Sequence, residues 1–214
     1  MKVKLFLALL FFAFSVYAKD AVTTLKLDLP IFDLPYQISA METVGYGFFS
    51  SYANPGMAQS LAVTVDMFSG FHYGMRTFYD TSNMNYIFRN IIYYGGTALG
   101  DTLLFYLPFG SAKWMHEEYH RAVMSRYGVN SFNSVYTFSS SVIKITDEDL
   151  IRFKAESPAA FVRMHGAGFE GEYLFADTLQ KNNFFYNKNY FTELVYWAIY
   201  IPASSYMFQN GWKR

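Results

Sequence analysis

The sequence predicts a mainly α-helical protein with one small β-hairpin. Residues 111–128 and 146–183 carry the start and stop signals of helices, with Ser, Thr or Pro at the start and Gly or Asn at the end. Between them, 135–138 and 142–145 are short runs of β-branched, apolar and aromatic residues separated by serines. Such runs indicate two strands joined by a turn, so the hairpin is expected between two long helices.

Differences in composition divide the chain into four segments. Residues 1–18 begin with lysines, continue with an apolar run and end in small residues, which is the pattern of a cleaved secretory signal peptide. Residues 19–84 contain many Pro, Gly and aromatic residues and are predicted to form an N-terminal arm and loops, with a short helix at 57–67. Residues 85–182 are predicted to form the helical core, and 183–214 an apolar C-terminal segment.

The composition favours a protein with large apolar surfaces, such as a membrane-facing protein or one with an aromatic-lined cleft. Aromatic residues make up 21% of the chain and charged residues only 16%, below the ~25% that is typical of soluble domains. The chain contains no cysteine, so it has neither disulfides nor a lipid-modified cysteine. It contains no basic stretch, which argues against nucleic-acid binding. Together with the signal peptide, these features predict a periplasmic or membrane-associated location.

Two long stretches with little charge have two interpretations each. Residues 90–112 contain a single charged residue, Asp101, and 194–212 contain none. Both are long enough to cross a bilayer, but glycines and a proline interrupt the first and Pro202 interrupts the second. We therefore expect 90–112 to be a buried core helix. The C-terminal stretch is either embedded in a membrane or a core helix that breaks at Pro202.

The most informative motif is H-E-x-x-H at residues 116–120, inside the first of the two long helices. His116 and His120 are four residues apart, so a helix presents both on one face, where two imidazoles can bind one metal ion. Glu117 lies about 100° further round the helix. Its carboxylate is therefore expected beside the metal, in a position to take a proton from a metal-bound water.

A catalytic zinc site needs a third protein ligand, and the second long helix offers several candidates. Helical spacing places Glu172 and His165 on one face, and Glu170 and Asp177 on another. Either Glu172 with His165 nearby, or Glu170 with Asp177 behind it, could face the metal. This helix also contains three glycines, which weaken it but allow another helix to approach closely: Gly166, Gly168 and Gly171.

The H-E-x-x-H motif followed by a glutamate on a later helix resembles the gluzincin class of zinc metallopeptidases. Residues 172–177 (E-Y-L-F-A-D) are similar to the E-Y-L-A-D segment of the HtpX-like membrane peptidases, with Phe175 as one additional residue. The resemblance implies a zincin-like helical core, made of a metal helix and a ligand helix. It also implies that Glu172 is the third zinc ligand and that Asp177 orients a zinc-binding histidine. Because Phe175 turns Asp177 by about 100° relative to Glu172, Glu170 stays as the alternative ligand.

The predicted function is zinc-dependent hydrolysis of peptide bonds in a peptide or protein substrate. In this hypothesis His116, His120 and Glu172 bind Zn²⁺, Glu117 is the general base, and His165 stabilises the oxyanion. The alternative is a non-enzymatic exported protein that associates with a membrane and carries the motif by coincidence. A di-iron carboxylate site is disfavoured, because it requires a second E-x-x-H motif that the sequence lacks.

Four other residues are expected to have supporting roles. His72 stands alone among aromatic residues and is expected to be a structural histidine with satisfied hydrogen bonds. Tyr119 and Glu118 fall off the metal face of their helix and are expected to provide packing and solvent contacts. Arg121 is expected to pair with an acid of the ligand helix.

Overall fold

The computed structural model describes residues 25–28, 55–137, 143–186 and 188–211, and the predicted signal peptide at 1–18 lies outside this part of the chain. The described residues form six α-helices and one antiparallel sheet of two short strands, which confirms the predicted class. In chain order the helices are α3 (Met57–Thr81), α4 (Tyr86–Tyr106), α5 (Ala112–Arg126), α6 (Asp147–Glu156), α7 (Pro158–Phe185) and α8 (Tyr190–Gly211). The strands are β1 (Phe132–Asn133) and β2 (Ile143–Lys144), and the 3₁₀ helix η2 (Ser134–Thr137) follows β1.

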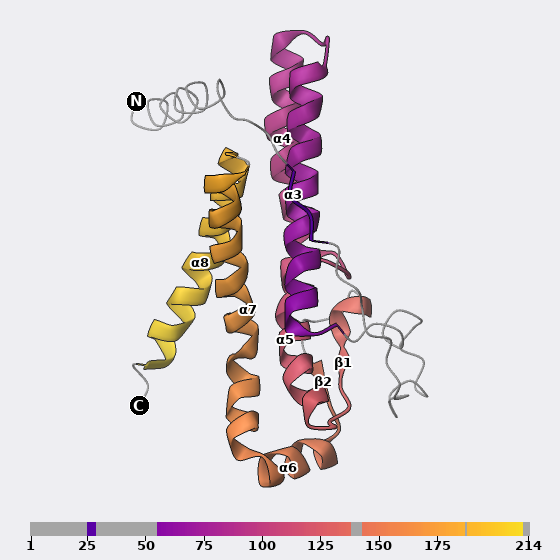
Figure 1. Cartoon of the computed structure of the whole chain (residues 1–214), viewed down its shortest axis with the longest axis vertical. Coiled ribbons are helices and arrows are strands. Elements are labelled where there is room, and N and C mark those ends of the chain that lie inside the picture. The colour runs from indigo at the N-terminus through magenta and orange to yellow at the C-terminus, as the bar shows by residue number, and fades with distance from the viewer. Residues whose placement is uncertain (1–24, 29–54, 138–142, 187, 212–214) are drawn as a thin grey trace.

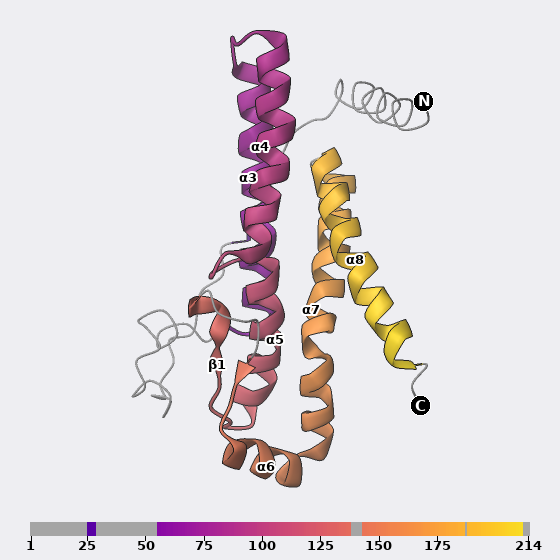
Figure 2. The ribbon, with the colours of Figure 1, turned by 180° about the vertical axis from the view of Figure 1, so that it is seen from behind.

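The helices form two long pairs that stand beside each other (Figure 1). α3 and α4 form an antiparallel hairpin, and α5 continues beyond the end of α4. α7 and α8 form the second pair, and α6 crosses one end of the molecule (Figures 1 and 2). α5 and α7 make the most extensive contact. The core lies where α3, α5 and α7 meet, around the fully buried side chains of Phe68, Trp114 and Phe175.

α3 is much longer than the short helix predicted at 57–67, and it continues to Thr81. The prediction that residues 19–84 form an arm and loops is therefore wrong for this helical part. Gly70 and Gly74 each destabilise a helix by roughly 1 kcal/mol relative to alanine. These two glycines lower the helix propensity of the segment, so the sequence alone does not predict the full length of α3. Packing of α3 on α4, α5 and α7 buries one of its faces and outweighs this cost.

A buried polar contact connects α3, α4 and α8. His72 on α3 is 1% exposed, and its Nε2 lies 2.7 Å from Oδ1 of Asp101 on α4. Its Nδ1 lies 3.0 Å from Oγ1 of Thr192 on α8. Both ring nitrogens therefore have partners, which confirms that His72 is a structural histidine. The same contact explains why the weakly charged stretch of α4 contains one acid.

α4 differs from the buried core helix predicted for 90–112. One face packs on its neighbours and buries Tyr93, Thr97 and Leu104, whereas the opposite face is exposed, because no other described element covers it. α8 also differs from the prediction, since it continues through Pro202 without a break. Among the described residues, none of the helices combines the length and the apolar character that a membrane crossing requires.

The β-hairpin is shorter than predicted, and its first strand is displaced. β1 precedes the strand predicted at 135–138, most of which forms η2, while the last residue of that run lies outside the described part. The cause is local: the side chain of Asn133 accepts a hydrogen bond from the N–H of Val135 at 3.0 Å, which turns the chain. β2 falls inside the second predicted run, 142–145.

The helix that carries the H-E-x-x-H motif begins and ends as predicted. The hydroxyl of Ser111 accepts a hydrogen bond from the N–H of Trp114 at 2.9 Å, and Gly128 has a positive φ of 68° just beyond the helix. α7 begins with Pro158 in its first turn, as predicted, and extends slightly past its predicted end. Both helices of the candidate site therefore start from local sequence signals.

Candidate metal centre

α5 and α7 cross at two glycines of α7. A Cβ atom at Gly168 would lie 2.4 Å from Nε2 of His116, and one at Gly171 would lie 2.9 Å from the ring of Tyr119. These positions confirm that the glycines let the two helices approach closely, although a Cβ atom at Gly166 would meet nothing within 4 Å. The backbone of α7 therefore forms one wall around His116.

His116 and His120 project from the same face of α5, as their spacing predicts. Their Nε2 atoms are 3.1 Å apart, and their ring planes make an angle of 72°. Two nitrogens that bind one zinc ion at about 2.0–2.1 Å in a tetrahedral site lie roughly 3.3 Å apart. The observed separation of the two nitrogens is therefore close to that of two ligands of one metal ion.

The opposite nitrogen of each ring is held by an oxygen from α7. Nδ1 of His116 donates to Oε1 of Glu172 at 2.8 Å, and Nδ1 of His120 donates to the backbone carbonyl of Met164 at 2.5 Å. Because these oxygens accept, each Nδ1 carries a proton, and a ring without a second proton presents the lone pair of its Nε2. Metal-binding histidines are usually held in this way, with the second nitrogen on a carboxylate or a backbone carbonyl.

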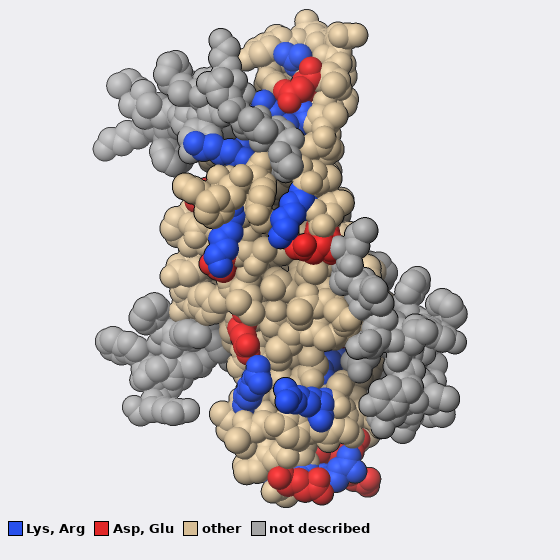
Figure 3. Space-filling view, in the orientation of Figure 1, with Lys and Arg blue, Asp and Glu red and all other residues tan. Residues whose placement is uncertain are grey.

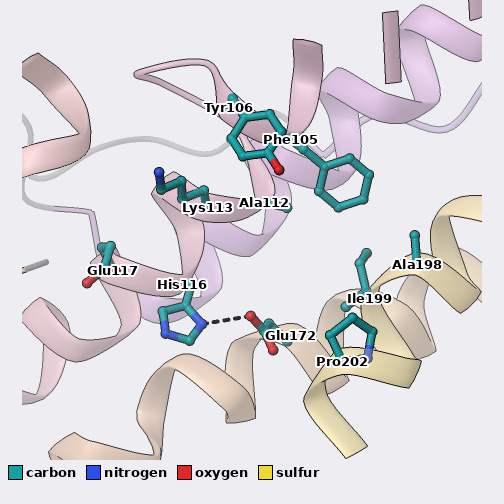
Figure 4. Close-up of a pocket in the computed structure, with 10 residues that line it drawn as sticks. All are labelled: Phe105, Tyr106, Ala112, Lys113, His116, Glu117, Glu172, Ala198, Ile199 and Pro202. Carbon is teal, nitrogen blue, oxygen red and sulfur yellow. Dashed lines mark hydrogen bonds and ion pairs between the residues drawn. The ribbon is translucent and has the colours of Figure 1, made fainter. Parts of the chain in front are cut away.

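Glu172 contacts His116 on the side away from His120. In Figure 4 its carboxylate points from α7 toward the ring of His116, and the dashed line marks this contact. Within the described part of the chain, no group of three or more His, Cys, Asp or Glu side chains is arranged to hold a metal ion. The structure therefore brings only part of the predicted ligand set together. The Nε2 atoms of His116 and His120 face each other, whereas Glu172 binds the opposite nitrogen of the His116 ring.

The other acids of α7 face away from the histidines. Glu170 lies 3.5 Å from Arg163, and its side chain is 43% exposed. Asp177 pairs with Lys181 at 2.5 Å, and its side chain is 51% exposed. The predicted role of Asp177 in orienting a histidine is therefore wrong, because five residues of helix turn it about 140° away from Glu172. Glu172 itself occupies that orienting position.

Glu117 lines a cavity between four helices. The cavity has a volume of about 460 Å³, and residues of α4, α5, α7 and α8 form its wall: Phe105, Tyr106, Ala112, Lys113, His116, Glu117, Glu172, Ala198, Ile199 and Pro202. In Figure 4, Glu117 and Glu172 lie on opposite sides of His116. Glu117 is only 6% exposed, and burial raises the pKa of its carboxyl group, while the charge of His116 acts against this rise. A carboxylate with a raised pKa is a better proton acceptor than an exposed one.

His165 lies outside this cavity. Its ring packs edge-on against Phe161, with ring centroids 4.8 Å apart, and its side chain is exposed. It follows Met164, whose carbonyl holds His120, so it stands near the histidine pair without joining it. The geometry therefore gives no support to the predicted oxyanion role of His165.

Sequence reasoning misses a buried ion pair on the opposite side of α5. Glu118 is fully buried, and Arg121 donates to both of its carboxylate oxygens, at 2.8 and 2.9 Å. Asn133 also donates to Glu118, at 2.9 Å, which ties the hairpin to α5. The predictions that Glu118 contacts solvent and that Arg121 pairs with an acid of the ligand helix are both wrong. The available signal is the spacing of three residues between opposite charges on a helix.

Similarity to known proteins does not identify a family for this chain. No family model, no curated protein and no solved structure matches it.

We predict that the metal-free protein loses stability as the pH falls from 6.5 toward 4. Burial lowers the pKa of His120 from 6.5 to about 4; the hydrogen bond to Met164 opposes this shift and the charge of His116 adds to it. Unfolding restores the higher pKa, so the unfolded chain binds more protons in this range and acid favours it. At pH 4 the loss in unfolding free energy is about 2–3 kcal/mol.

Denaturant unfolding at a series of pH values, with a chelator present, measures this loss, and His120→Gln is the control. Burial raises the pKa values of Glu117 and Glu118, so their contributions have the opposite sign. Because both carboxyl groups are present in both proteins, their contributions largely cancel in the difference. The same pH dependence in the wild type and in His120→Gln would contradict the prediction.

Proposed function

We propose that this protein is a zinc-dependent hydrolase of peptide bonds, in which His116 and His120 bind the metal and Glu117 is the general base. The observation that carries the proposal is the pair of Nε2 atoms 3.1 Å apart, on rings whose Nδ1 atoms both donate to oxygens of α7. Two lone pairs at this distance repel each other unless a proton or a metal cation lies between them. Imidazole nitrogens are among the common ligands of Zn²⁺.

The residues of the site fit a zinc ion in their donor types. Neutral imidazole is the form that binds metals, and the lowered pKa of His120 keeps its ring neutral at pH 7. The resemblance to gluzincins implies Glu172 as the third ligand, with Glu170 as the alternative; in this structure the carboxylate of Glu172 meets Nδ1 of His116, and Glu170 faces Arg163. When bound, Zn²⁺ polarises a carbonyl group and lowers the pKa of a water molecule.

The role proposed for Glu117 is to take a proton from water and pass it to the leaving amine. It lines the cavity next to His116, and burial raises its pKa, which favours proton uptake. Glu172 keeps the ring of His116 in a fixed orientation through Nδ1. The peptide or protein substrate is proposed to bind in the cavity between α4, α5, α7 and α8.

Metal analysis of the purified protein tests the proposal. We expect about one zinc ion per chain in the wild type, and its loss when His116 or His120 is replaced by asparagine. The matched control is His165→Asn, which removes an exposed histidine outside the cavity and should leave the zinc content unchanged. A wild-type protein without zinc, or an equal loss of zinc in His165→Asn, would contradict the proposal.

A Glu172→Gln variant is expected to bind zinc about 10–100 times more weakly than the wild type. This factor is typical for the loss of a carboxylate that holds a metal-binding histidine, and the contact to His116 measures 2.8 Å. Competition with a zinc-binding dye measures the affinity. Glu170→Gln, which changes an exposed carboxylate of the same helix, should have no effect; a larger loss there would make Glu170 the ligand.

The alternative function, a membrane-associated protein without enzymatic activity, is favoured by the exposed apolar face of α4. The zinc content of the purified protein distinguishes the two functions. The hydrolase should contain zinc, whereas the alternative function does not require a bound metal. A surface that binds membranes is also compatible with a hydrolase.

A further inference from the structure

One side of α4 is exposed, apolar and uncharged. The helix contains two charged residues: Asp101 is buried against His72, and Arg89 lies over the ring of Tyr79. The opposite face consists of large residues that are 40–65% exposed: Tyr86, Ile87, Phe88, Ile91, Ile92, Leu99, Leu103 and Tyr106. This face follows a helix of 21 residues, which is about 30 Å long. A continuous apolar surface of this extent normally contacts a partner or a membrane.

α8 and the corner before it present a second surface of the same kind. The large residues exposed on α8 are Leu194, Trp197, Tyr200 and Ile201, at 38–59%. From Leu194 to Ser205 this helix contains no charged residue. The corner between α7 and α8 exposes Phe184 by 81% and Phe185 by 69%.

α4 and α8 lie on the same side of the molecule. In Figure 2 both helices are in front of their partners α3 and α7, which are nearer to the viewer in Figure 1. Charged side chains of both signs are spread along the α3 and α7 side, which Figure 3 shows. The cavity beside His116 opens between the two apolar faces, because its wall includes the exposed residues Tyr106 of α4 and Pro202 of α8.

The chemistry of this side matches a lipid bilayer. A cavity of about 460 Å³ lies between the end of α4 and the middle of α8. Fluid acyl chains can fill such a hollow, whereas a protein partner needs a matching shape. Tyr86 and Tyr106 are 65% and 64% exposed on this face, and tyrosine is enriched at membrane–water interfaces. Lys113 lies 5.6 Å from the ring centroid of Tyr106, and Lys188 is exposed at the α7–α8 corner. These lysines supply positive charge for anionic headgroups.

We infer that the exposed faces of α4 and α8 dock this protein on the surface of an anionic lipid bilayer, with the mouth of the cavity toward the lipid. The apolar and aromatic side chains enter the interface, and the charged α3 and α7 side stays in water. This docking involves no residue of the histidine pair, so it holds or fails independently of zinc binding.

Flotation of the full chain with vesicles of phosphatidylcholine and phosphatidylglycerol tests the proposal. The wild type is expected to float with these vesicles, and less so with phosphatidylcholine alone. Replacing Ile91 and Leu99, which are 61% and 62% exposed, by glutamate should weaken binding at least about tenfold, because a negative charge opposes insertion and is repelled by anionic headgroups. The matched control replaces Ile151 and Val162, which are 69% and 70% exposed on α6 and at the start of α7, and should bind like the wild type.

Trp197 provides a second readout that needs no change to the binding surface. It is 46% exposed on α8, whereas Trp114 is fully buried. Brominated lipids should therefore quench the fluorescence of the wild type more strongly than that of Trp197→Phe, which keeps Trp114 and Trp212. A wild type that neither floats nor is quenched, or an equal loss of binding in the control pair, overturns the proposal. The proposal would also be overturned if the protein formed a dimer that does not bind vesicles and that dissociates when Ile91 and Leu99 are substituted. The apolar surface would then be the contact with a second copy of the chain.

Discussion

A Glu117→Gln variant is expected to bind zinc like the wild type and to hydrolyse protein substrates about 10²–10⁴ times more slowly. The amide has nearly the same shape as the carboxylate, so it can keep its place in the cavity wall. It cannot take up a proton, which is the proposed role of Glu117. Zinc should be retained because the nitrogens of His116 face His120 on one side and Glu172 on the other.

Fluorescently labelled casein can serve as a general substrate, with zinc content measured on the same preparations. Glu170→Gln is the control, because it removes one exposed carboxylate from α7 and leaves the cavity unchanged. The control should match the wild type in both rate and zinc. A Glu117→Gln protein that hydrolyses at the wild-type rate cannot be reconciled with the proposed base, and one that loses its zinc would make Glu117 a part of the metal site.

The helices of the site could be predicted because their signals are local. Ser111 bonds to Trp114 within the first turn of α5, and Gly128 reaches its positive φ just after the last turn. The common face of His116 and His120 follows from a spacing of four residues on that helix. None of these features depends on where the rest of the chain lies.

The surroundings of the site could not be predicted because they depend on contacts between distant residues. His72 and Asp101 are 29 positions apart in the sequence, and their contact fixes which face of α4 is buried. The buried environment of Glu118 likewise includes a hydrogen bond from Asn133, which belongs to strand β1 of the hairpin. The sequence of α4 is apolar on most sides, so it does not reveal that one face is left open.

The acids of α7 show the limit of helical periodicity in another way. Spacing places Glu172 and Glu170 on different faces of α7 without saying which face meets the histidines, and in the structure it is that of Glu172. It does not say which ring nitrogen the carboxylate meets, because this depends on side-chain rotamers and on the distance between the helices. Here the ring of His116 lies directly against Gly168, and the close crossing presents Nδ1 to Glu172.

A Gly168→Ala variant tests whether the histidine pair depends on this close crossing. The new methyl group would lie 2.4–2.6 Å from three atoms of the His116 ring, so the ring has to move. The ring is the end of a flexible side chain, and its movement therefore costs the fold little. It breaks the contact with Glu172 and separates the two Nε2 atoms. Loss of the carboxylate that holds a metal-binding histidine typically costs about 10–100-fold in metal affinity, and we expect zinc affinity to fall by about this factor.

Gly166→Ala is the matched control on the same helix, because a Cβ atom there meets nothing within 4 Å. Alanine is favoured over glycine in a helix by roughly 1 kcal/mol, so both variants gain the same propensity and differ only in the contact with His116. Gly166→Ala should melt at a slightly higher temperature and bind zinc like the wild type. Zinc titration and thermal unfolding followed by circular dichroism separate these effects. Equal zinc affinity in the two variants would mean that His116 does not bind metal from its position against α7.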